Sequence, residues 1–219
     1  MNIKRITFWT IFCLIIVLII WGLALSMKKS ANLPSGLVLG EAGTVTTQDH
    51  VEGPADAPVT IIEYSDFQCP ACQYYYTFVE KLTAEASTTV RVIYRHFPLP
   101  QHANAMPAAI ASEAASAQGK FWEMYDLLFT NAAEWVDLSD ASPIFLKYAE
   151  TIDLDTARFT VDLASSTIRE RVISDKNGGI KIGLNATPTF FINGKAIENP
   201  QNYEQFKALV DTAAITGTK

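Results

Sequence analysis

Hydrophobic residues follow two different patterns along the chain. Residues 6–25 form one apolar run without a charged side chain, which Lys4 and Arg5 precede and Lys28 and Lys29 follow. A helix of this length spans about 30 Å, the hydrocarbon thickness of a bilayer. The run therefore predicts a membrane-spanning helix, and the balance of basic residues favours a cytoplasmic N-terminus with the remainder exported.

A cleaved signal peptide is the alternative interpretation of this run. Signal peptides have shorter apolar regions, of about 7–15 residues, although Ala24-Leu25-Ser26 offers a small-residue cleavage site. We favour a retained anchor, in which Cys13 is a small hydrophobic residue. The predicted parts are a cytoplasmic N-terminus at residues 1–5, a transmembrane signal-anchor at 6–26, a linker at 27–51 and a folded domain at 52–219.

In the rest of the chain, short β-branched runs alternate with longer segments in which apolar residues recur every three or four positions. The runs predict strands at 59–64, 90–96, 188–192 and 195–197, and a short strand near 37–39. The longer segments predict helices at about 70–86, 102–117, 120–131, 142–152, 155–163, 166–176 and 203–215. Asn177-Gly178-Gly179 is predicted to end the helix at 166–176. The elements follow the order β-α-β, a block of helices, and β-β-α.

Charge and composition exclude several classes of protein. The chain has 17 Lys and Arg against 23 Asp and Glu, and residues 1–30 hold four of the basic residues and none of the acidic ones. The remainder is therefore acidic, which argues against nucleic acid as a partner because phosphates need a basic face. With 49% hydrophobic residues the chain is not disordered, and its three cysteines are too few for a disulfide-stapled scaffold.

A Cys-x-x-Cys motif, Cys69-Pro70-Ala71-Cys72, separates the strand at 59–64 from the helix that follows. The first sulfur is expected at the N-terminus of that helix, where unpaired N–H groups and the helix dipole stabilise a thiolate. The second sulfur lies one turn further, close enough to attack a mixed disulfide on the first. Pro70 suits the first helical turn, which needs no N–H at that position. We expect Cys69 to be the nucleophile and Cys72 the resolving thiol.

Two structural interpretations of the cysteine pair compete with the catalytic one. Half a zinc site would need two more ligands, and the chain has neither a second Cys-x-x-Cys nor a pair of histidines close in sequence. His50, His96 and His102 are scattered, and we expect each to be a solvated or core residue rather than a ligand. A disulfide that closes a four-residue loop would constrain the unfolded chain little. We therefore predict no metal site.

Two further features lie near the motif in the predicted order. Glu63 stands six residues before Cys69 in an otherwise apolar strand. It either points under the motif helix, where a poorly solvated carboxyl could relay the proton of Cys72, or faces water from an edge strand. Thr187-Pro188 stands at the start of the strand predicted at 188–192, just before Thr189-Phe190-Phe191, and a proline there suits an edge that receives a substrate strand.

Three ordered motifs resemble those of a known family: FQCPAC after a strand, HANAMPAAIASEAASAQGKFWEMYDLLF in the middle, and GLNATPTFFINGK near the end. They are similar to the DsbA family of thioredoxin-fold thiol–disulfide oxidoreductases, in its membrane-anchored, Gram-positive-like form. The resemblance extends from about Glu52 to Ile215. It implies an α/β thioredoxin-like fold with a central mixed sheet, a helical insertion at about 101–181, and one N-terminal transmembrane helix.

The resemblance also implies roles for the residues of the site. Cys69 would be the surface nucleophile, Cys72 its buried partner, Glu63 the buried acid, and Thr187-Pro188 the cis-proline loop. His102 would be a helix cap or a hinge residue. Strong oxidants of the family carry histidine where this chain has Ala71, so Pro70 and Ala71 would set a couple that is less oxidising, with the pKa of Cys69 still lowered.

The function that we expect is that of an extracytoplasmic oxidase, which passes its disulfide to reduced exported proteins through a mixed disulfide at Cys69. A membrane quinone-linked partner of the DsbB or VKOR type would re-oxidise it, and no cofactor beyond the Cys69–Cys72 disulfide is expected. The chain would be a monomer held to the bilayer by residues 6–26. A reductase or isomerase kept reduced by a membrane electron donor is the alternative, and a thiol-based copper carrier is a third.

Overall fold

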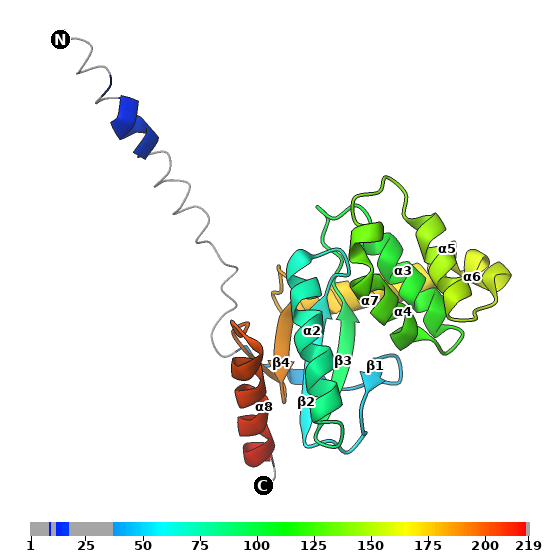
Figure 1. Ribbon diagram of the computed structural model, residues 1–219. Coiled ribbons are helices and arrows are strands. Elements are labelled where there is room, and N and C mark those ends of the chain that lie inside the picture. The colour runs from blue at the N-terminus through cyan, green and yellow to red at the C-terminus, as the bar shows by residue number, and fades with distance from the viewer. Residues whose placement is uncertain (1–8, 10–11, 18–36, 218–219) are drawn as a thin grey trace. The chain divides into compact units, whose positions relative to one another are not determined.

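The computed structural model describes residues 9, 12–17 and 37–217 (Figure 1). The chain divides into two compact units, residues 1–35 and 36–219. Of the transmembrane anchor predicted at residues 6–26, only Trp9 and a helical segment at 12–17 are described, and the rest lies outside the described residues. Among the described helices, none combines the length and the apolar character that crossing a membrane requires.

A five-stranded mixed sheet forms the centre of the second unit, and a central mixed sheet is what the family resemblance implies. Its strands, in the spatial order β1-β3-β2-β4-β5, are β1 (His50–Glu52), β3 (Val90–His96), β2 (Val59–Ser65), β4 (Thr189–Ile192) and β5 (Lys195–Ala196). Strands β2 and β3 are parallel, and the other three pairings are antiparallel. The central strand β2 is therefore flanked on both sides, which means that Glu63 does not lie on an edge strand.

Helices occupy the segments in which the sequence shows helical periodicity. They are α2 (Pro70–Glu85), α3 (Ala105–Ser116), α4 (Phe121–Thr130), α5 (Ser142–Thr151), α6 (Thr156–Leu163), α7 (Ser166–Lys181) and α8 (Tyr203–Gly217), with short 3-10 helices at Gly40–Gly43 and Ala132–Glu134. Asp155 caps α6 by accepting a hydrogen bond from the Arg158 N–H at 2.9 Å. Helix α3 begins three residues later than predicted, which places Pro107 in its first turn, where proline is tolerated.

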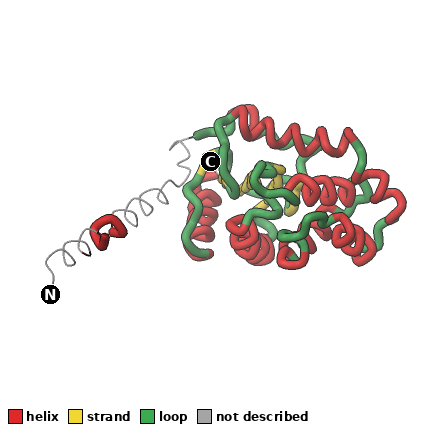
Figure 2. Tube along the Cα trace, turned by 90° about the horizontal axis from the view of Figure 1, so that it is seen from above, coloured by secondary structure: helices red, strands yellow, loops and turns green. Residues whose placement is uncertain are grey.

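Helices α2 and α8 cover one face of the sheet. Alternate residues of β2 and β3, among them Val59, Ile61 and Val92, pack with Val79 of α2 and Phe206 of α8 in one buried cluster. Successive side chains of a strand point to opposite faces, so Glu63 lies on this same face. Figure 2 shows helices on both sides of the strands.

Helix α7 covers the opposite face, and it corrects the prediction that a helix ends at residue 176. The helix continues through Asn177-Gly178-Gly179 to Lys181. A Cβ atom on Gly179 would lie 2.7 Å from the ring of Phe97 and 3.2 Å from that of Tyr64. Glycine is thus needed at position 179 for close approach of α7 to the sheet, and its presence does not end the helix.

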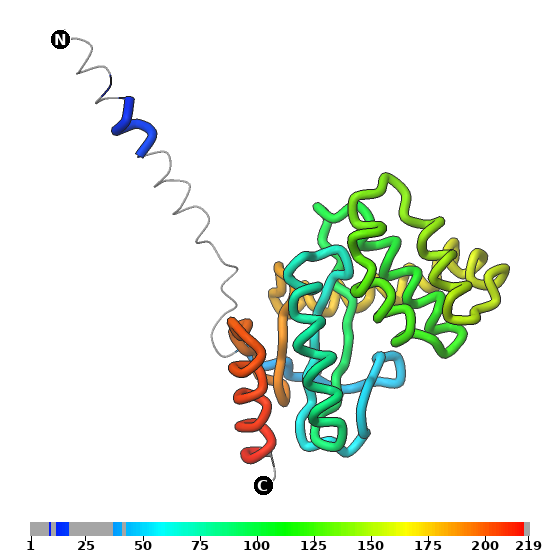
Figure 3. Tube along the Cα trace, viewed as in Figure 1, coloured from blue at the N-terminus to red at the C-terminus, as the bar shows by residue number. Residues whose placement is uncertain are grey.

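Helices α3 to α7 form the insertion between β3 and β4, as the resemblance implies (Figure 3). A single buried cluster joins this insertion to the cysteine motif, because Phe67, Cys72 and Tyr94 belong to the same cluster as Met124 and Trp135. The position of α2 is therefore determined by packing from both the sheet and the insertion.

The segment from residue 37 to residue 51, predicted as the end of a linker, contributes to the folded unit. Val38 forms an isolated bridge with Lys195, where a short strand near 37–39 was predicted, and residues 50–52 form β1. Asp49 pairs with Arg95 of β3, with 2.8 Å between its Oδ1 and the Arg95 Nε, and both side chains are buried. Polar residues that pair across elements give no hydrophobic periodicity, which explains why the segment reads as a tether in the sequence.

Candidate active site at the dithiol

Cys69 and Cys72 differ sharply in their surroundings although one helical turn separates them. Cys69 is the N-cap of α2, Pro70 occupies the first helical turn, and Cys72 lies inside the helix. Both are free thiols. Cys69 keeps 7% of its surface exposed beside the exposed Pro70 and Ala71, whereas Cys72 is completely buried. An incoming sulfur can therefore reach Cys69 and cannot reach Cys72.

The site lowers the pKa of Cys69 to about 5. The largest cause is a hydrogen bond from the Cys72 thiol, which outweighs the opposing effect of burial. The hydroxyl of Thr187 and the backbone N–H groups of Ala71 and Cys72 also favour the thiolate. Cys69 is thus ionised at neutral pH, and its negative charge lies at the N-terminus of α2.

Burial has the opposite effect on Cys72 and on Glu63 of β2. It raises the pKa of Cys72 far above its ordinary value, and the nearby Cys69 thiolate and Glu63 carboxylate raise it further. Burial also raises the pKa of Glu63 to about 7, and the charge of Cys69 adds to the effect. Glu63 is 1% exposed and points under the motif helix, one of the two orientations that the sequence left open.

Ser65 and Tyr94 accompany Glu63 at the buried end of the site. In the described part of the chain, neither carboxylate oxygen of Glu63 has a hydrogen-bond partner, and the same holds for the hydroxyls of Ser65 and Tyr94. Tyr94 stands opposite Glu63 in the parallel pairing of β2 and β3. Polar groups that gather unpaired in a protein interior are uncommon, and they mark a place where protons are exchanged or a water is bound.

The loop before β4 faces the nucleophile. The peptide bond between Thr187 and Pro188 is cis, and the Thr187 carbonyl oxygen lies 3.6 Å from the Cys69 Sγ. Asn199 supports the loop by donating to the Pro188 carbonyl at 2.9 Å. Beside it, residues 197–201 and α8 line a groove of about 530 Å³. Asn199, which supports the cis-proline loop, is thus also part of the wall of this groove.

Asp66 and His102 belong to the site, and the sequence analysis missed their pairing. The buried Asp66 carboxylate accepts hydrogen bonds from the N–H groups of Gln68 at 2.8 Å and Leu99 at 2.9 Å, and its Oδ2 lies 2.7 Å from the His102 Nδ1. His102 neither caps nor starts α3, whose N-cap is Asn104. Aspartate often accepts a hydrogen bond from the backbone N–H two residues later in a turn. Asp66, three residues before Cys69, could therefore have been predicted to shape this loop.

Gln68 and Asn104 make a second connection between the motif loop and the insertion. The Gln68 side chain accepts from the Asn104 N–H and donates to the Val136 carbonyl, both at 2.6 Å. Asn104 in turn donates to the Leu138 carbonyl at 2.8 Å. No sequence signal marks such long-range amide pairs. Together with Asp66 they hold the loop that carries Cys69 against the helical block.

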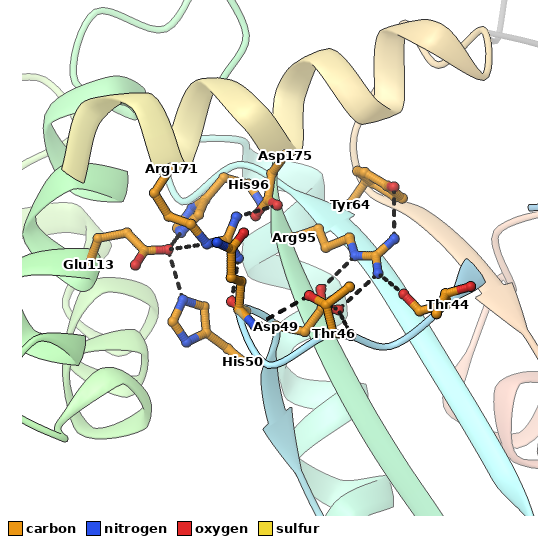
Figure 4. A network of polar contacts seen from close by, with 11 residues as sticks. Thr44, Thr46, Asp49, His50, Tyr64, Arg95, His96, Glu113, Arg171 and Asp175 are labelled. Atoms are coloured by element: carbon orange, nitrogen blue, oxygen red, sulfur yellow. Dashed lines mark hydrogen bonds and ion pairs between the residues drawn. The ribbon is translucent and has the colours of Figure 1, made fainter. Parts of the chain in front are cut away.

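The histidines predicted to be scattered are paired with acids in the structure. His102 contacts Asp66, and both His50 and His96 contact Glu113 of α3, at 2.8 and 3.0 Å. These last two pairs belong to a polar network where β3, the segment at 37–51 and α7 meet (Figure 4). The network lies outside the cysteine motif.

Comparison with known proteins places this geometry in context. A family model described as thioredoxin matches residues 45–212. Among curated relatives, the Na⁺/H⁺ antiporter NhaA 3 of Salinispora tropica is 42% identical over 167 residues, which are 76% of this chain and 25% of that protein. NhaA of Herminiimonas arsenicoxydans is 35% identical over 201 residues, 91% of this chain and 30% of that protein. The chain thus spans only about a quarter of the length of the curated relatives it matches.

Solved structures resemble the described domain over nearly their whole length. The α-DsbA1 of Wolbachia pipientis has a TM-score of 0.72 at 22% identity, over 81% of this chain and 96% of that one. Oxidised BdbD of Bacillus subtilis also has a TM-score of 0.72, at 21% identity, over 83% and 100% of the two chains. A thioredoxin-like oxidoreductase of Silicibacter pomeroyi has a TM-score of 0.64 at 25% identity, over 77% and 93%. At 22% and 21% identity, the similarity to the first two structures is a similarity of fold.

Proposed function

The chain belongs to the thioredoxin family and carries a thiol–disulfide oxidoreductase domain of DsbA type, and on this premise we propose that it is an oxidase that donates the Cys69–Cys72 disulfide to reduced proteins. The observation that carries the proposal is the lowered pKa of Cys69, about 5, beside the raised pKa of Cys72. A stabilised thiolate favours the reduced enzyme, so its disulfide is readily given away.

The proposed reaction proceeds in two exchanges. A substrate thiolate attacks the Cys69 sulfur, which forms a mixed disulfide and releases Cys72 as a thiolate. A second substrate thiolate then attacks the substrate sulfur of that mixed disulfide, so that the substrate gains its disulfide and Cys69 leaves as a thiolate. The substrate is oxidised by two electrons and the cysteine pair is reduced. The low pKa of Cys69 makes it the better leaving group in the second exchange.

Glu63 serves this reaction as the proton reservoir for Cys72. The thiolate released from Cys72 lies in a completely buried place, where it needs a proton at once. Glu63 has a pKa of about 7 and can therefore hold a proton at neutral pH and release it there. When the dithiol is re-oxidised, the proton returns to the carboxylate.

The magnitude of the Cys69 shift supports an oxidising couple. Lowering a thiol pKa from 9.0 to about 5 stabilises the folded thiolate at pH 7 by about 3 kcal/mol. For a two-electron couple this corresponds to about 60 mV toward the oxidising side. The couple stays short of the strongest oxidants of the family because Ala71 contributes no charge.

Location and re-oxidation form the second part of the proposal. An oxidase of this kind works where thiols are not kept reduced, outside the cytoplasm, with the apolar segment at 6–26 as a membrane anchor. A quinone-linked membrane protein of the DsbB or VKOR type would take up the electrons, and reduced exported proteins would supply them. The cysteine pair itself carries the electrons, so the reaction needs no further cofactor.

The test measures the potential and the two half-reactions on the full chain. The protein is equilibrated with glutathione buffers, and oxidation of a reduced peptide is followed. We expect Cys69→Ser to abolish oxidation and Cys72→Ser to accumulate mixed disulfides, while Cys13→Ser serves as the control that changes neither. A potential near that of thioredoxin would support a reductase instead, and stoichiometric copper retention would support a carrier.

A further inference from the structure

Three side chains that could bind a metal converge away from the cysteines. They come from three different elements: His50 from β1, His96 from β3 and Glu113 from α3. The Nε2 atoms of His50 and His96 lie 2.8 and 3.0 Å from the same Glu113 oxygen, Oε1. One ligand atom from each residue lies within 4.8 Å of the other two. In Figure 4 the two rings and the carboxylate point toward one another.

Packing holds these groups in place. The His50 ring stacks on the Phe121 ring, with 3.5 Å between centroids and an angle of 5° between planes. The side chains of His96 and Glu113 are 1% and 8% exposed, and that of His50 is 10% exposed. The three ligand atoms are therefore held in place before any ion binds. Solvent reaches the cluster most easily at His50.

The charge of the cluster is negative, which favours binding of a cation. The nearest guanidinium, that of Arg171, has its Nε 3.9 Å from Glu113, but it is engaged mainly by Asp175 of α7 and by the Gln48 carbonyl. Two carboxylates thus share one guanidinium, and with neutral imidazoles the cluster carries one net negative charge. Burial raises the pKa of Glu113, but hydrogen bonds from His50 and His96 outweigh it and hold the pKa well below its usual range, so the carboxylate is ionised.

We propose that His50, His96 and Glu113 form a binding site for a divalent late first-row transition cation such as Zn²⁺, with His50 Nε2, His96 Nε2 and Glu113 Oε1 as ligands. Two imidazole nitrogens and one carboxylate oxygen match the ligand preference of such ions, whereas Ca²⁺ and Mg²⁺ prefer oxygen ligands. Ligands about 2.0–2.1 Å from Zn²⁺ in tetrahedral geometry lie about 3.3 Å from one another, close to the separations of 2.8 and 3.0 Å between the two imidazole nitrogens and the carboxylate oxygen. The fourth position is left for water on the side of His50.

Binding rearranges protons within the cluster in a defined way. Each Nε2 that now contacts the carboxylate carries a hydrogen, and the ion takes its place when that hydrogen moves to Nδ1 of the same neutral ring. An imidazole nitrogen binds a metal ion only through its lone pair, so Zn²⁺ and protons compete for the two rings. The ion would connect β1 and β3 of the sheet with α3 of the helical insertion.

The test uses the oxidised full chain with Cys13→Ser, so that no free thiol takes up metal. Zn²⁺ is titrated in competition with a chromophoric chelator at neutral pH. We expect one Zn²⁺ per chain, and a loss of affinity of at least about tenfold in His50→Gln and in Glu113→Gln. His102→Gln is the matched control, because the third histidine contacts Asp66, and it should stay within about twofold of the parent.

Two results would overturn the proposal. The first is a parent chain that binds no stoichiometric Zn²⁺, which would make the cluster an ion-pair network without a metal. The second is that all three variants bind Zn²⁺ as tightly as the parent, which would place the ion elsewhere. If Glu113→Gln does not fold, His50→Gln decides the matter alone, with circular dichroism to confirm its fold. Since the cysteines stay oxidised throughout, neither result bears on the proposed oxidase activity.

Discussion

Replacing Cys72 shows how the site stabilises the Cys69 thiolate. The Cys72 thiol is the largest cause of the lowered Cys69 pKa, which is about 5. A hydrogen bond to a charged group contributes about 1.5–3 kcal/mol, which corresponds to about 1–2 pKa units. We therefore expect Cys72→Ala to raise the Cys69 pKa to about 6–7. Cys72→Ser keeps an O–H donor at the same place, and we expect it to leave the pKa near 5.

The same change affects the stability of the reduced protein, with a definite sign. A thiol whose pKa is lowered on folding stabilises the folded state fully above its unfolded pKa of 9.0, and the contribution disappears as the pH falls through about 5. At pH 7 it amounts to about 3 kcal/mol, of which Cys72→Ala removes about 1–2 kcal/mol. The loss of stability of the Ala variant relative to the Ser variant must therefore shrink toward zero below pH 5.

The assay follows the ultraviolet absorbance of the thiolate from about pH 3 to about pH 9 in the Cys13→Ser background, where Cys69 is the sole thiol of each variant. Urea unfolding of both variants at neutral and acid pH measures the stability difference. Equal titration midpoints for the Ala and Ser variants would refute the reasoning. In that case the backbone N–H groups and the N-terminus of α2 would account for the thiolate, and the partner sulfur would not.

Three further predictions follow from the described contacts. Ala71→His places a cation beside Cys69, so the pKa of that thiol should fall by about one unit and the couple become more oxidising; an unchanged titration midpoint would contradict this. Glu63→Gln should raise the free energy of unfolding at pH 7 by about 3 kcal/mol, because a raised pKa costs stability above pH 4.5, and it should slow peptide oxidation; urea unfolding should show the gain vanish near pH 4.5. Asp49→Asn removes the carboxylate charge that the buried Arg95 faces and should lower the free energy of unfolding, measured with urea, by about 3–5 kcal/mol, whereas breaking the exposed Lys207–Asp211 pair of α8 should change it little.

Local sequence signals predicted those parts of the fold that depend on local physics. The strands around Ile61 and Ile93 follow from β-branched runs, and the cysteine pair at a helix start follows from the motif and its neighbours. The sequence does not decide whether Glu63 is buried or faces water. Strand alternation shows which residues lie on the same face of the sheet as Glu63, but it does not show what covers that face. Burial under α2 becomes apparent only once β2 is found between two other strands.

Long-range polar pairing is what the sequence could not provide. Gly179 looked like a helix terminator because glycine favours helix ends, and the reason for its presence is a ring that is distant in sequence, that of Phe97. His50 and His96 are 46 positions apart, and the carboxylate that joins them, Glu113, stands in a helix whose apolar pattern gives it no special mark. Such pairs depend on topology, which a single sequence does not reveal.

The site combines three titrating groups whose pKa values lie in a useful order. Cys69 is at about 5 and Glu63 at about 7, while Cys72 lies far above its ordinary value. At neutral pH Cys69 is thus ionised and Cys72 is protonated. The pKa of the Glu63 carboxyl lies between theirs, so this group can either give or take a proton. A carboxyl buried without a partner costs about 3 kcal/mol at pH 7, so Glu63 does not stabilise the fold, and this supports the proton exchange proposed for it. Glu63→Asp tests this, because it keeps the charge but withdraws the carboxyl by one methylene; if peptide oxidation is as fast as in the parent across the neutral range, the placement of the carboxyl has no role in catalysis.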